Sequence, residues 1–222
     1  MNIMEVIRAC TRDDLLRPEF IEALMGRLGF NNEMPSEQPK FVRENTGGLR
    51  IWQYPNQFSK YLIFLSGLGA TSYLEIGCRW GGTFILTCEY LKKFGPFTKS
   101  LAVDPIDSPV AAYCRENPES NFMQAYSTSR EFIKHIDKEF YDVIFIDGDH
   151  SYDGVALDYH TCKSHGRVFV FHDIVNDACP GVSRFWNELK ADESSEYTFH
   201  EFTDQYPDVA GSFLGIGVAV KV

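Results

Sequence analysis

The chain has 222 residues, of which 44% are hydrophobic, and its 31 acidic and 21 basic side chains give a formal net charge of −10. This length and hydrophobic content suit one domain with a full core, or a domain plus a small extension, and exclude a disordered chain. The excess of acidic over basic side chains argues against binding to nucleic acid, because contact with phosphates needs a basic surface. The apolar stretches are too short to cross a bilayer, and the N-terminus lacks the apolar run of a signal peptide. We therefore expect a soluble, cytoplasmic protein with no membrane partner.

Six cysteines are present, with no CxxC pair and no spacing typical of a zinc site. In a chain of this length, free cysteines are usually small buried side chains. We therefore expect reduced thiols in the core and neither a zinc ribbon nor a disulfide scaffold.

The first thirty residues predict two short helices. Thr11 and Asp14 form a capping pair, Pro18 suits a first helical turn, and Gly29 ends the second helix. Residues 31–48 are polar, with two prolines and two adjacent glycines, and predict a long loop. Loops of this length are usually lids or linkers. We therefore divide the chain into a helical extension with a lid loop at residues 1–50 and a main domain at residues 51–222.

From residue 54 onward, helices alternate with short apolar strands. Helices are expected at residues 54–67, 81–96, 128–140, 152–165 and around 182–189, and strands at 72–78, 99–105, 121–127, 141–147, 167–174, 196–202 and 213–222. Thr128 and Glu131 are expected to cap the third of these helices, with Phe132, Ile133, Ile136 and Phe140 on one face. This alternation predicts an α/β fold with a parallel sheet covered on both faces. The last two strands have no helix between them and predict an antiparallel hairpin.

The turn after the first of these strands is rich in glycine. It contains Glu75, Gly77, Cys78, Arg79, Trp80, Gly81 and Gly82. Ligands of parallel sheets bind where strands end, and glycines let the backbone approach them closely. The dinucleotide fingerprint GxGxxG is not matched, because Arg79 stands at its second glycine. Asp104 ends the second strand, where a carboxylate accepts the hydroxyls of a ribose; the alternative is a helix cap near Ser108.

The fourth and fifth strands of this region also end in ionisable residues. The segment FIDGDHSYDG contains Asp147, Asp149 and His150, and FHDI contains His172 and Asp173. So many carboxylates and imidazoles on adjacent strand ends need a cation, a substrate or helix dipoles to compensate their charges. For His172 alone, the alternative is a hydrogen bond to a neighbouring loop. The density of the cluster favours a functional site.

The motifs YLEIGCRWGG, LAVDP, FIDGDHSYDGV and VFHDI together resemble the class I S-adenosylmethionine-dependent methyltransferases, in particular the subset called methyltransferase domain 24. The resemblance covers about residues 55–222, and FIDGDHSY followed by FHD is its most specific element. It implies a Rossmann-like, mostly parallel seven-stranded sheet in the order 3-2-1-4-5-7-6. The last strand is antiparallel, and helices cover both faces.

The resemblance also implies a cofactor site for S-adenosylmethionine. Asp104 corresponds to the ribose carboxylate, and Tyr126 and Ser127 would flank the adenine. Arg79 departs from the common loop, which has a glycine at that position. The full set of implied cofactor-binding residues is Glu75, Gly77, Cys78, Arg79, Gly81, Gly82, Asp104, Tyr126, Ser127 and Asp147.

Some members of the family hold magnesium with acidic residues at the ends of strands four and five. Asp147 and Asp173 occupy the matching positions, and His150 corresponds to a catalytic base. His172 stands where relatives have a carboxylate, so the implied metal ligands are Asp147, Asp173 and His172. A histidine ligand would favour manganese or iron over magnesium.

The sequence thus predicts an S-adenosylmethionine-dependent methyltransferase for a small-molecule acceptor, most readily an O-methyltransferase assisted by Mg²⁺ or Mn²⁺. The catalytic residues would be His150 and Asp147, since the acceptor hydroxyl must lose a proton. The N-terminal helices and loop would select the acceptor; Trp52, Tyr54 and Trp80 either stack on it or only pack. Two alternatives stay open, an NAD-type oxidoreductase and a non-catalytic cofactor-binding domain. A homo-oligomer is also open.

Overall fold

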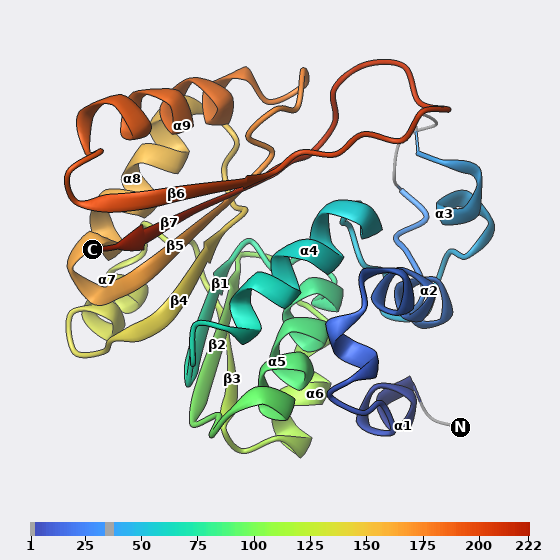
Figure 1. The fold of residues 1–222 in the computed structure, drawn as a ribbon. Coiled ribbons are helices and arrows are strands. Elements are labelled where there is room, and N and C mark those ends of the chain that lie inside the picture. The colour runs from blue at the N-terminus through green and yellow to red at the C-terminus, as the bar shows by residue number, and fades with distance from the viewer. Residues whose placement is uncertain (1–2, 34–37) are drawn as a thin grey trace.

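A computed structural model describes residues 3–33 and 38–222, and a seven-stranded sheet forms its centre (Figure 1). The strand order is β3-β2-β1-β4-β5-β7-β6, with β1 to β5 parallel and β7 antiparallel to both neighbours. The predicted fold class, including the terminal hairpin, is confirmed. The strands are β1 (Ser72–Ile76), β2 (Lys99–Asp104), β3 (Ser120–Gln124), β4 (Tyr141–Ile146), β5 (Gly166–His172), β6 (Tyr197–Phe202) and β7 (Ile216–Lys221).

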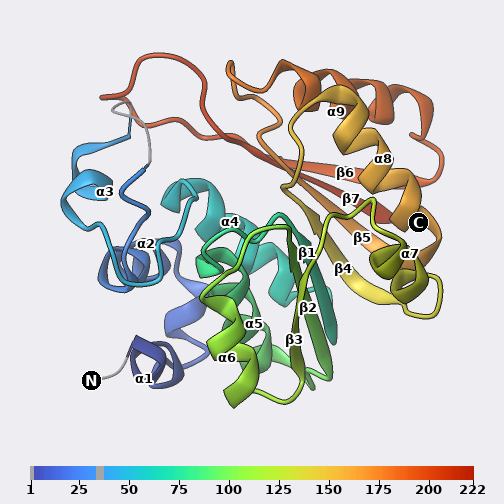
Figure 2. The same cartoon turned by 180° about the vertical axis from the view of Figure 1, so that it is seen from behind.

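Helices cover both faces of the sheet, as Figures 1 and 2 show. One face carries α4 (Pro55–Ser66), α5 (Gly82–Phe94) and α6 (Val110–Glu116), and the other carries α7 (Arg130–Ile136), α8 (Tyr152–Cys162) with the 3₁₀ turn η2 (Lys163–His165), and α9 (Pro180–Asp192). Successive strand residues alternate between two apolar cores, so Tyr73 faces α4 and α5 while Leu74 faces the other layer. Among the residues described, we find no helix with the length and apolar character that a membrane span requires.

The N-terminal helices pack onto the α4 and α5 layer. They are α1 (Ile3–Arg8), the 3₁₀ turn η1 (Asp14–Leu16) and α2 (Pro18–Leu28). The capping pair is confirmed at η1: the Thr11 hydroxyl donates to Asp14 Oδ2 at 2.7 Å, and the Asp14 N–H donates to Thr11 Oγ1 at 3.1 Å. The apolar stripe of α2 is buried in the same core as α4. The extension therefore shares its core with the sheet.

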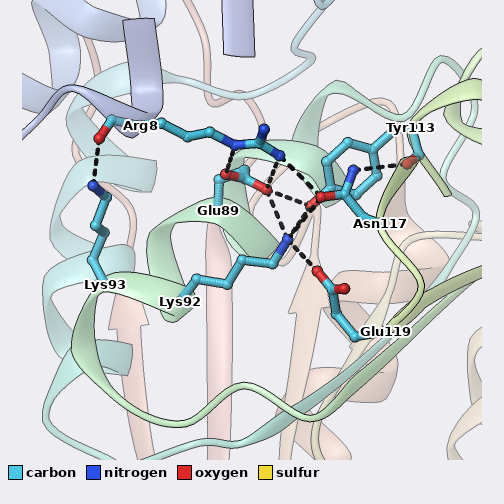
Figure 3. Close-up of polar contacts among 7 residues, drawn as sticks. All are labelled: Arg8, Glu89, Lys92, Lys93, Tyr113, Asn117 and Glu119. Carbon is cyan, nitrogen blue, oxygen red and sulfur yellow. Dashed lines mark hydrogen bonds and ion pairs between the residues drawn. The ribbon is translucent and has the colours of Figure 1, made fainter. Parts of the chain in front are cut away.

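An ion-pair network fastens α1 to α5 and α6 (Figure 3). Arg8 Nε donates to Glu89 Oε2 at 2.9 Å, and Lys92 Nζ and the Tyr113 hydroxyl each donate to Glu89 Oε1 at 2.8 Å. The Arg8 guanidinium also donates to Asn117 Oδ1. Burial alone would raise the pKa of Glu89, but these hydrogen bonds outweigh it and lower the pKa to about 2. The buried carboxylate is thus charged and fully partnered.

Three local predictions were wrong. Residues 31–48 are not one uninterrupted loop, because α3 (Lys40–Glu44) forms within them; residues 34–37 of that loop lie outside the described part. At α7 the cap is Ser129, whose Oγ accepts from the Phe132 N–H at 3.1 Å, and not Thr128. That helix ends at Ile136, so Phe140 lies beyond it and is 48% exposed. Ile133 is 40% exposed, and the buried face of the helix consists of Phe132 and Ile136.

The cysteines agree with the sequence prediction. All six thiols are free, five are buried, and Cys114 is half-buried.

Candidate active site at the strand ends

Four polar residues at the ends of β1, β2, β4 and β5 share one face of the sheet. Each of them stands two positions after a residue that is buried in the core beneath α4 and α5. Side chains two positions apart on a strand point to the same face of the sheet. The four are Glu75, Asp104, Asp147 and His172, which follow Tyr73, Ala102, Phe145 and Val170. The alternation of side chains along each strand and the register between the strands therefore place these four residues close together at the carboxyl ends of the strands.

Glu75 is the most deeply buried of these groups. It accepts a hydrogen bond from the Tyr73 hydroxyl at 2.5 Å. Burial raises the pKa of Glu75 to about 8, and the nearby charge of Asp147 acts in the same direction. Glu75 is therefore predominantly uncharged at neutral pH.

The glycine-rich turn has the backbone that its sequence requires. Gly77 and Gly81 have φ values of +86° and +81°, and an added β-carbon on Gly77 would lie 2.0 Å from the Asp147 carbonyl oxygen. Arg79 also takes a left-handed conformation, with φ +43°. Arg79 thus adopts the backbone conformation that a glycine most readily takes. Cys78 is buried beside the turn.

The N-terminal extension contacts this turn through several side chains. Arg79 forms an ion pair with Glu33 at 2.6 Å, and its guanidinium carbon lies 4.9 Å from the Trp52 ring centroid. Reciprocally, Arg50 lies 4.5 Å from the Trp80 ring centroid. An added β-carbon on Gly82 would meet the Leu49 carbonyl oxygen at 2.3 Å, so the segment also packs against the start of α5.

Of the three candidate aromatic residues for stacking on an acceptor, Tyr54 is fully buried and packs edge-on against Tyr206 at 5.3 Å. Trp52 and Trp80 are half-buried and lie under the two arginines. Tyr54 is therefore a packing residue.

Asp104 is tied to the glycine-rich turn. Its Oδ2 accepts from the Arg79 N–H at 2.6 Å, and its Oδ1 accepts from the Ile106 N–H at 3.0 Å. The helix-cap alternative is wrong, because α6 begins at Val110, whose N–H donates to Ser108 Oγ. Tyr126 and Ser127 follow β3, beside the end of β2, where the Ala125 N–H donates to the Asp104 carbonyl. Tyr126 is 68% exposed.

Asp147, His150, His172 and Asp173 form one cluster, which we call the acid–imidazole cluster. Asp147 Oδ1 lies 3.1 Å from His172 Nδ1 and 3.3 Å from His150 Nε2. Asp173 Oδ2 lies 3.3 Å from His150 Nδ1 and 3.5 Å from His172 Nδ1. Asp149 stands outside this cluster; its Oδ1 accepts from the Ser151 N–H at 2.9 Å in a local turn.

The charges in the acid–imidazole cluster compensate one another. The hydrogen bond to Asp147 raises the pKa of His150 to about 11. Burial opposes protonation of His172, but the Asp147 and Asp173 carboxylates outweigh it and raise the pKa to about 10. Burial would raise the pKa of each carboxyl, yet the positive charge of His172 lowers both. Two imidazolium ions thus neutralise two carboxylates.

The same cluster has the donors for a divalent cation. One ligand atom each from Asp147, His172 and Asp173 lies within 4.8 Å of the others. An ion bound at about 2.0–2.3 Å from each ligand needs ligand atoms about 3–4.5 Å apart. His172 Nε2 is buried without a hydrogen-bond partner in the described part of the chain, while Nδ1 faces the carboxylates. The residues present fit a cation.

Sequence reasoning missed Cys179 and Asn176. Cys179 Sγ lies 3.2 Å from His150 Nδ1 and 3.5 Å from Asp173 Oδ2, and Asn176 Nδ2 donates to Asp173 Oδ1 at 2.7 Å. Both residues follow β5 closely in the sequence, and that proximity to FHDI was the available signal.

Known proteins are similar to this chain in sequence. Residues 74–174 match the family described as Methyltransferase domain. Rhamnosyl O-methyltransferases of Mycobacterium bovis and Mycobacterium tuberculosis are 27% identical over 116 residues, 50% of this chain and 47% of theirs. The matched region thus spans about half the length of these curated relatives. An uncharacterized protein of Acanthamoeba polyphaga mimivirus is 24% identical over 207 residues, 80% of this chain and 86% of that protein.

Solved structures show the same fold. An O-methyltransferase from Bacillus cereus in complex with SAH has a TM-score of 0.56 at 14% identity, with 96% of this chain and 92% of that one covered. The O-methyltransferase TomG from Streptomyces achromogenes in complex with SAM has a TM-score of 0.55 at 15% identity, with 78% and 83% covered. The family match covers the ends of the central strands, and the sheet order 3-2-1-4-5-7-6 is the one that the resemblance to class I S-adenosylmethionine-dependent methyltransferases implies.

Proposed function

We propose that this chain is an S-adenosylmethionine-dependent O-methyltransferase that acts on a hydroxyl group of a small molecule. The observation that carries the proposal is the contact between the glycine-rich turn and the acid–imidazole cluster, where Gly77 lies against the Asp147 backbone. A donor on the turn would thus have its methyl group beside residues able to take a proton. The name of the mycobacterial relatives makes sugar hydroxyls the first acceptors to test.

The glycine-rich turn and Asp104 would bind the cofactor. Asp104 is buried with both oxygens already accepting backbone N–H groups, and each oxygen has a further lone pair for a ribose hydroxyl. Helix α5 begins at Gly82, within the turn, and the first N–H groups of a helix have no acceptor inside that helix. Glu75, Cys78, Arg79, Gly81 and Gly82 would enclose the amino acid part, with Tyr126 and Ser127 beside the adenine.

His150 is the proposed base. It accepts a proton only as neutral imidazole, and a cation held by Asp147 and Asp173 would offset the carboxylate charge that otherwise favours the imidazolium. Methyl transfer from a sulfonium is an in-line displacement, so the protein has to position donor and acceptor and accept the hydroxyl proton. The His150 side chain is 41% exposed, which lets an acceptor reach it, while Asp147 and Asp173 orient its two nitrogens. Asp147 thereby acts as its positioning residue.

Asp147, His172 and Asp173 would hold a divalent cation. When bound, Mg²⁺ or Mn²⁺ would polarise the acceptor hydroxyl and supply the positive charge that compensates the carboxylates. The nitrogen donor of His172 favours Mn²⁺ or Fe²⁺ over Mg²⁺, since magnesium prefers oxygen ligands.

Residues 1–50 would form the extension and lid that select the acceptor, and residues 51–222 the catalytic domain. The Arg79–Glu33 ion pair and the Arg79–Trp52 contact support this role, because they join the extension to the cofactor turn. A lid at this position would exclude water from the transferring methyl group.

Calorimetric titration with S-adenosylmethionine and with NAD tests the cofactor. We expect binding of S-adenosylmethionine only; tight NAD binding without S-adenosylmethionine binding would indicate an oxidoreductase. Methyl transfer is then measured on a panel of sugars, catechols and hydroxy acids. Cofactor binding without transfer to any acceptor would favour a non-catalytic domain. Equal activity in EDTA and in added Mg²⁺ or Mn²⁺ would refute the metal ligands.

A further inference from the structure

A second set of donor atoms shares Asp173 with the proposed cation site and differs from that site in chemistry. It consists of His150 Nδ1, Asp173 Oδ2 and Cys179 Sγ, which we call the thiol triad. We propose that the thiol triad is a binding site for a thiophilic divalent cation of the zinc class. The proposal goes beyond methyl transfer and does not depend on it.

The spacing of the thiol triad matches a metal site. The nitrogen lies 3.2 Å from the sulfur and 3.3 Å from the oxygen, and the sulfur lies 3.5 Å from the oxygen. With zinc bonds of about 2.0–2.3 Å, a tetrahedral site needs ligand atoms about 3.3–3.6 Å apart. All three edges are within about 0.4 Å of that requirement. An ion would therefore enter with little rearrangement of the three donors.

A tight turn holds two of the three donors in place. Asn176 Nδ2 donates to Asp173 Oδ1, and Asp173 Oδ2 faces the triad while also lying 3.5 Å from His172 Nδ1. The Asn176 N–H donates to the Asp173 carbonyl at 3.3 Å, and the Cys179 N–H donates to the Asn176 carbonyl at 2.9 Å. These bonds bring the chain back on itself so that Cys179 meets Asp173, six residues earlier.

A glycine brings the third donor close. An added β-carbon on Gly181 would lie 2.8 Å from the His150 carbonyl oxygen and 2.4 Å from the Tyr152 nitrogen. Only a residue without a β-carbon lets the first turn of α9 approach the loop after β4 so closely. This contact sets Cys179 against the His150 ring.

The donor types select the ion. Cys179 is the N-cap of the 13-residue helix α9, and its sulfur faces His150 and Asp173. A set of one sulfur, one nitrogen and one oxygen suits Zn²⁺, Co²⁺ or Fe²⁺, whereas Mg²⁺ requires oxygens. Asp173 and Cys179 are buried, but the His150 side chain is 41% exposed. An ion could thus enter from the His150 side and keep a fourth position for water.

Cobalt spectroscopy tests the triad on the full chain with reduced thiols, without cofactor or acceptor. Titration with Co²⁺ should produce a thiolate-to-cobalt charge-transfer band in the near ultraviolet, saturating at one ion per chain. The band should be lost in Cys179→Ser and kept in the matched control Cys114→Ser, whose half-buried thiol lies on α6. No band in the unmodified chain, or a band that survives Cys179→Ser, would overturn the proposal.

A second measurement needs no variant, in case Cys179→Ser does not fold. The unmodified chain is alkylated with iodoacetamide in the presence of Zn²⁺ or Mg²⁺, and each cysteine is quantified by peptide mass mapping. Zn²⁺ should slow alkylation of Cys179 at least tenfold, and Mg²⁺ should not. An unchanged rate at saturating Zn²⁺, or equal protection by Mg²⁺, would reject the site. Because both readouts report binding alone, their outcome is separate from the test of methyl transfer.

Discussion

Gly77 lies against the carbonyl group of Asp147, so close that a β-carbon on Gly77 would sit 2.0 Å from that oxygen. The contact joins the cofactor turn after β1 to the acid–imidazole cluster after β4. The Asp147 N–H also donates to the Ile76 carbonyl at 2.9 Å, so the backbones of the two strand ends are joined directly. The relation between donor and base in the proposed reaction therefore depends on a residue without a side chain.

Gly77→Ala should destabilise the protein. The substitution introduces the clash with Asp147 and places a β-carbon at φ +86°. We expect a loss of at least about 2 kcal/mol in the free energy of unfolding, measured by urea denaturation. The control is Gly95→Ala, where an added β-carbon meets nothing within 4 Å and φ is −168°. Equal stability of the two variants would contradict the steric argument.

Asp104→Asn should weaken cofactor binding. The amide cannot accept hydrogen bonds at both of its polar atoms, and it carries no charge to strengthen those with ribose hydroxyls. We expect the dissociation constant for S-adenosylmethionine, measured by calorimetry, to rise by on the order of tenfold or more. Asp107→Asn is the matched control, because Asp107 is exposed three residues away. Unchanged affinity in Asp104→Asn would remove Asp104 from the site.

His150→Gln should lower turnover while leaving cofactor affinity nearly intact. Glutamine keeps hydrogen-bonding capacity but cannot accept the hydroxyl proton. The expected loss in kcat is on the order of a hundredfold or more, measured with any acceptor found in the panel. His160→Gln, on the exposed side of α8, should be active. A His150→Gln enzyme with normal kcat would show that another group accepts the proton.

The Glu89 network predicts a specific loss of stability in acid. Because the folded-state pKa of Glu89 is about 2 against an ordinary 4.5, its contribution is fully present above about pH 4.5 and is lost as the pH falls toward 2. Glu89→Gln should therefore lose on the order of 2 kcal/mol at pH 7 and show a smaller difference from the parent at pH 3. Glu116→Gln, at an exposed position on α6, is the control. The free energies of unfolding of the variant and the parent are measured at both pH values. A difference between them that grows toward pH 3 would contradict the prediction.

Arg79→Ala should loosen the extension from the cofactor turn. It removes the contact with Trp52, worth about 0.5–1 kcal/mol, and the surface ion pair with Glu33. Amide exchange in residues 49–53, followed by mass spectrometry, should accelerate about two- to fivefold. Arg43→Ala on α3 should leave those amides unchanged. Equal exchange rates in both variants would mean that the arginine does not hold the segment.

The sequence by itself determined the sheet and the positions of the candidate residues along it. Apolar strands alternating with helices require a covered parallel sheet, and the pattern of strand ends places Asp104, Asp147 and His172 at one edge. These inferences rest on local periodicity, which a sequence displays directly. The capping pair of Thr11 and Asp14 was readable for the same reason, because its partners are three residues apart.

The tertiary structure decided which residues meet. Ser129 replaced Thr128 as the cap of α7, since the choice between adjacent hydroxyls depends on where the chain enters the helix. Cys179 reaches His150 only because Gly181 lets α9 pack against the loop after β4. Contacts between segments far apart in the chain depend on how those segments are packed together, and single-sequence periodicity carries no record of that packing.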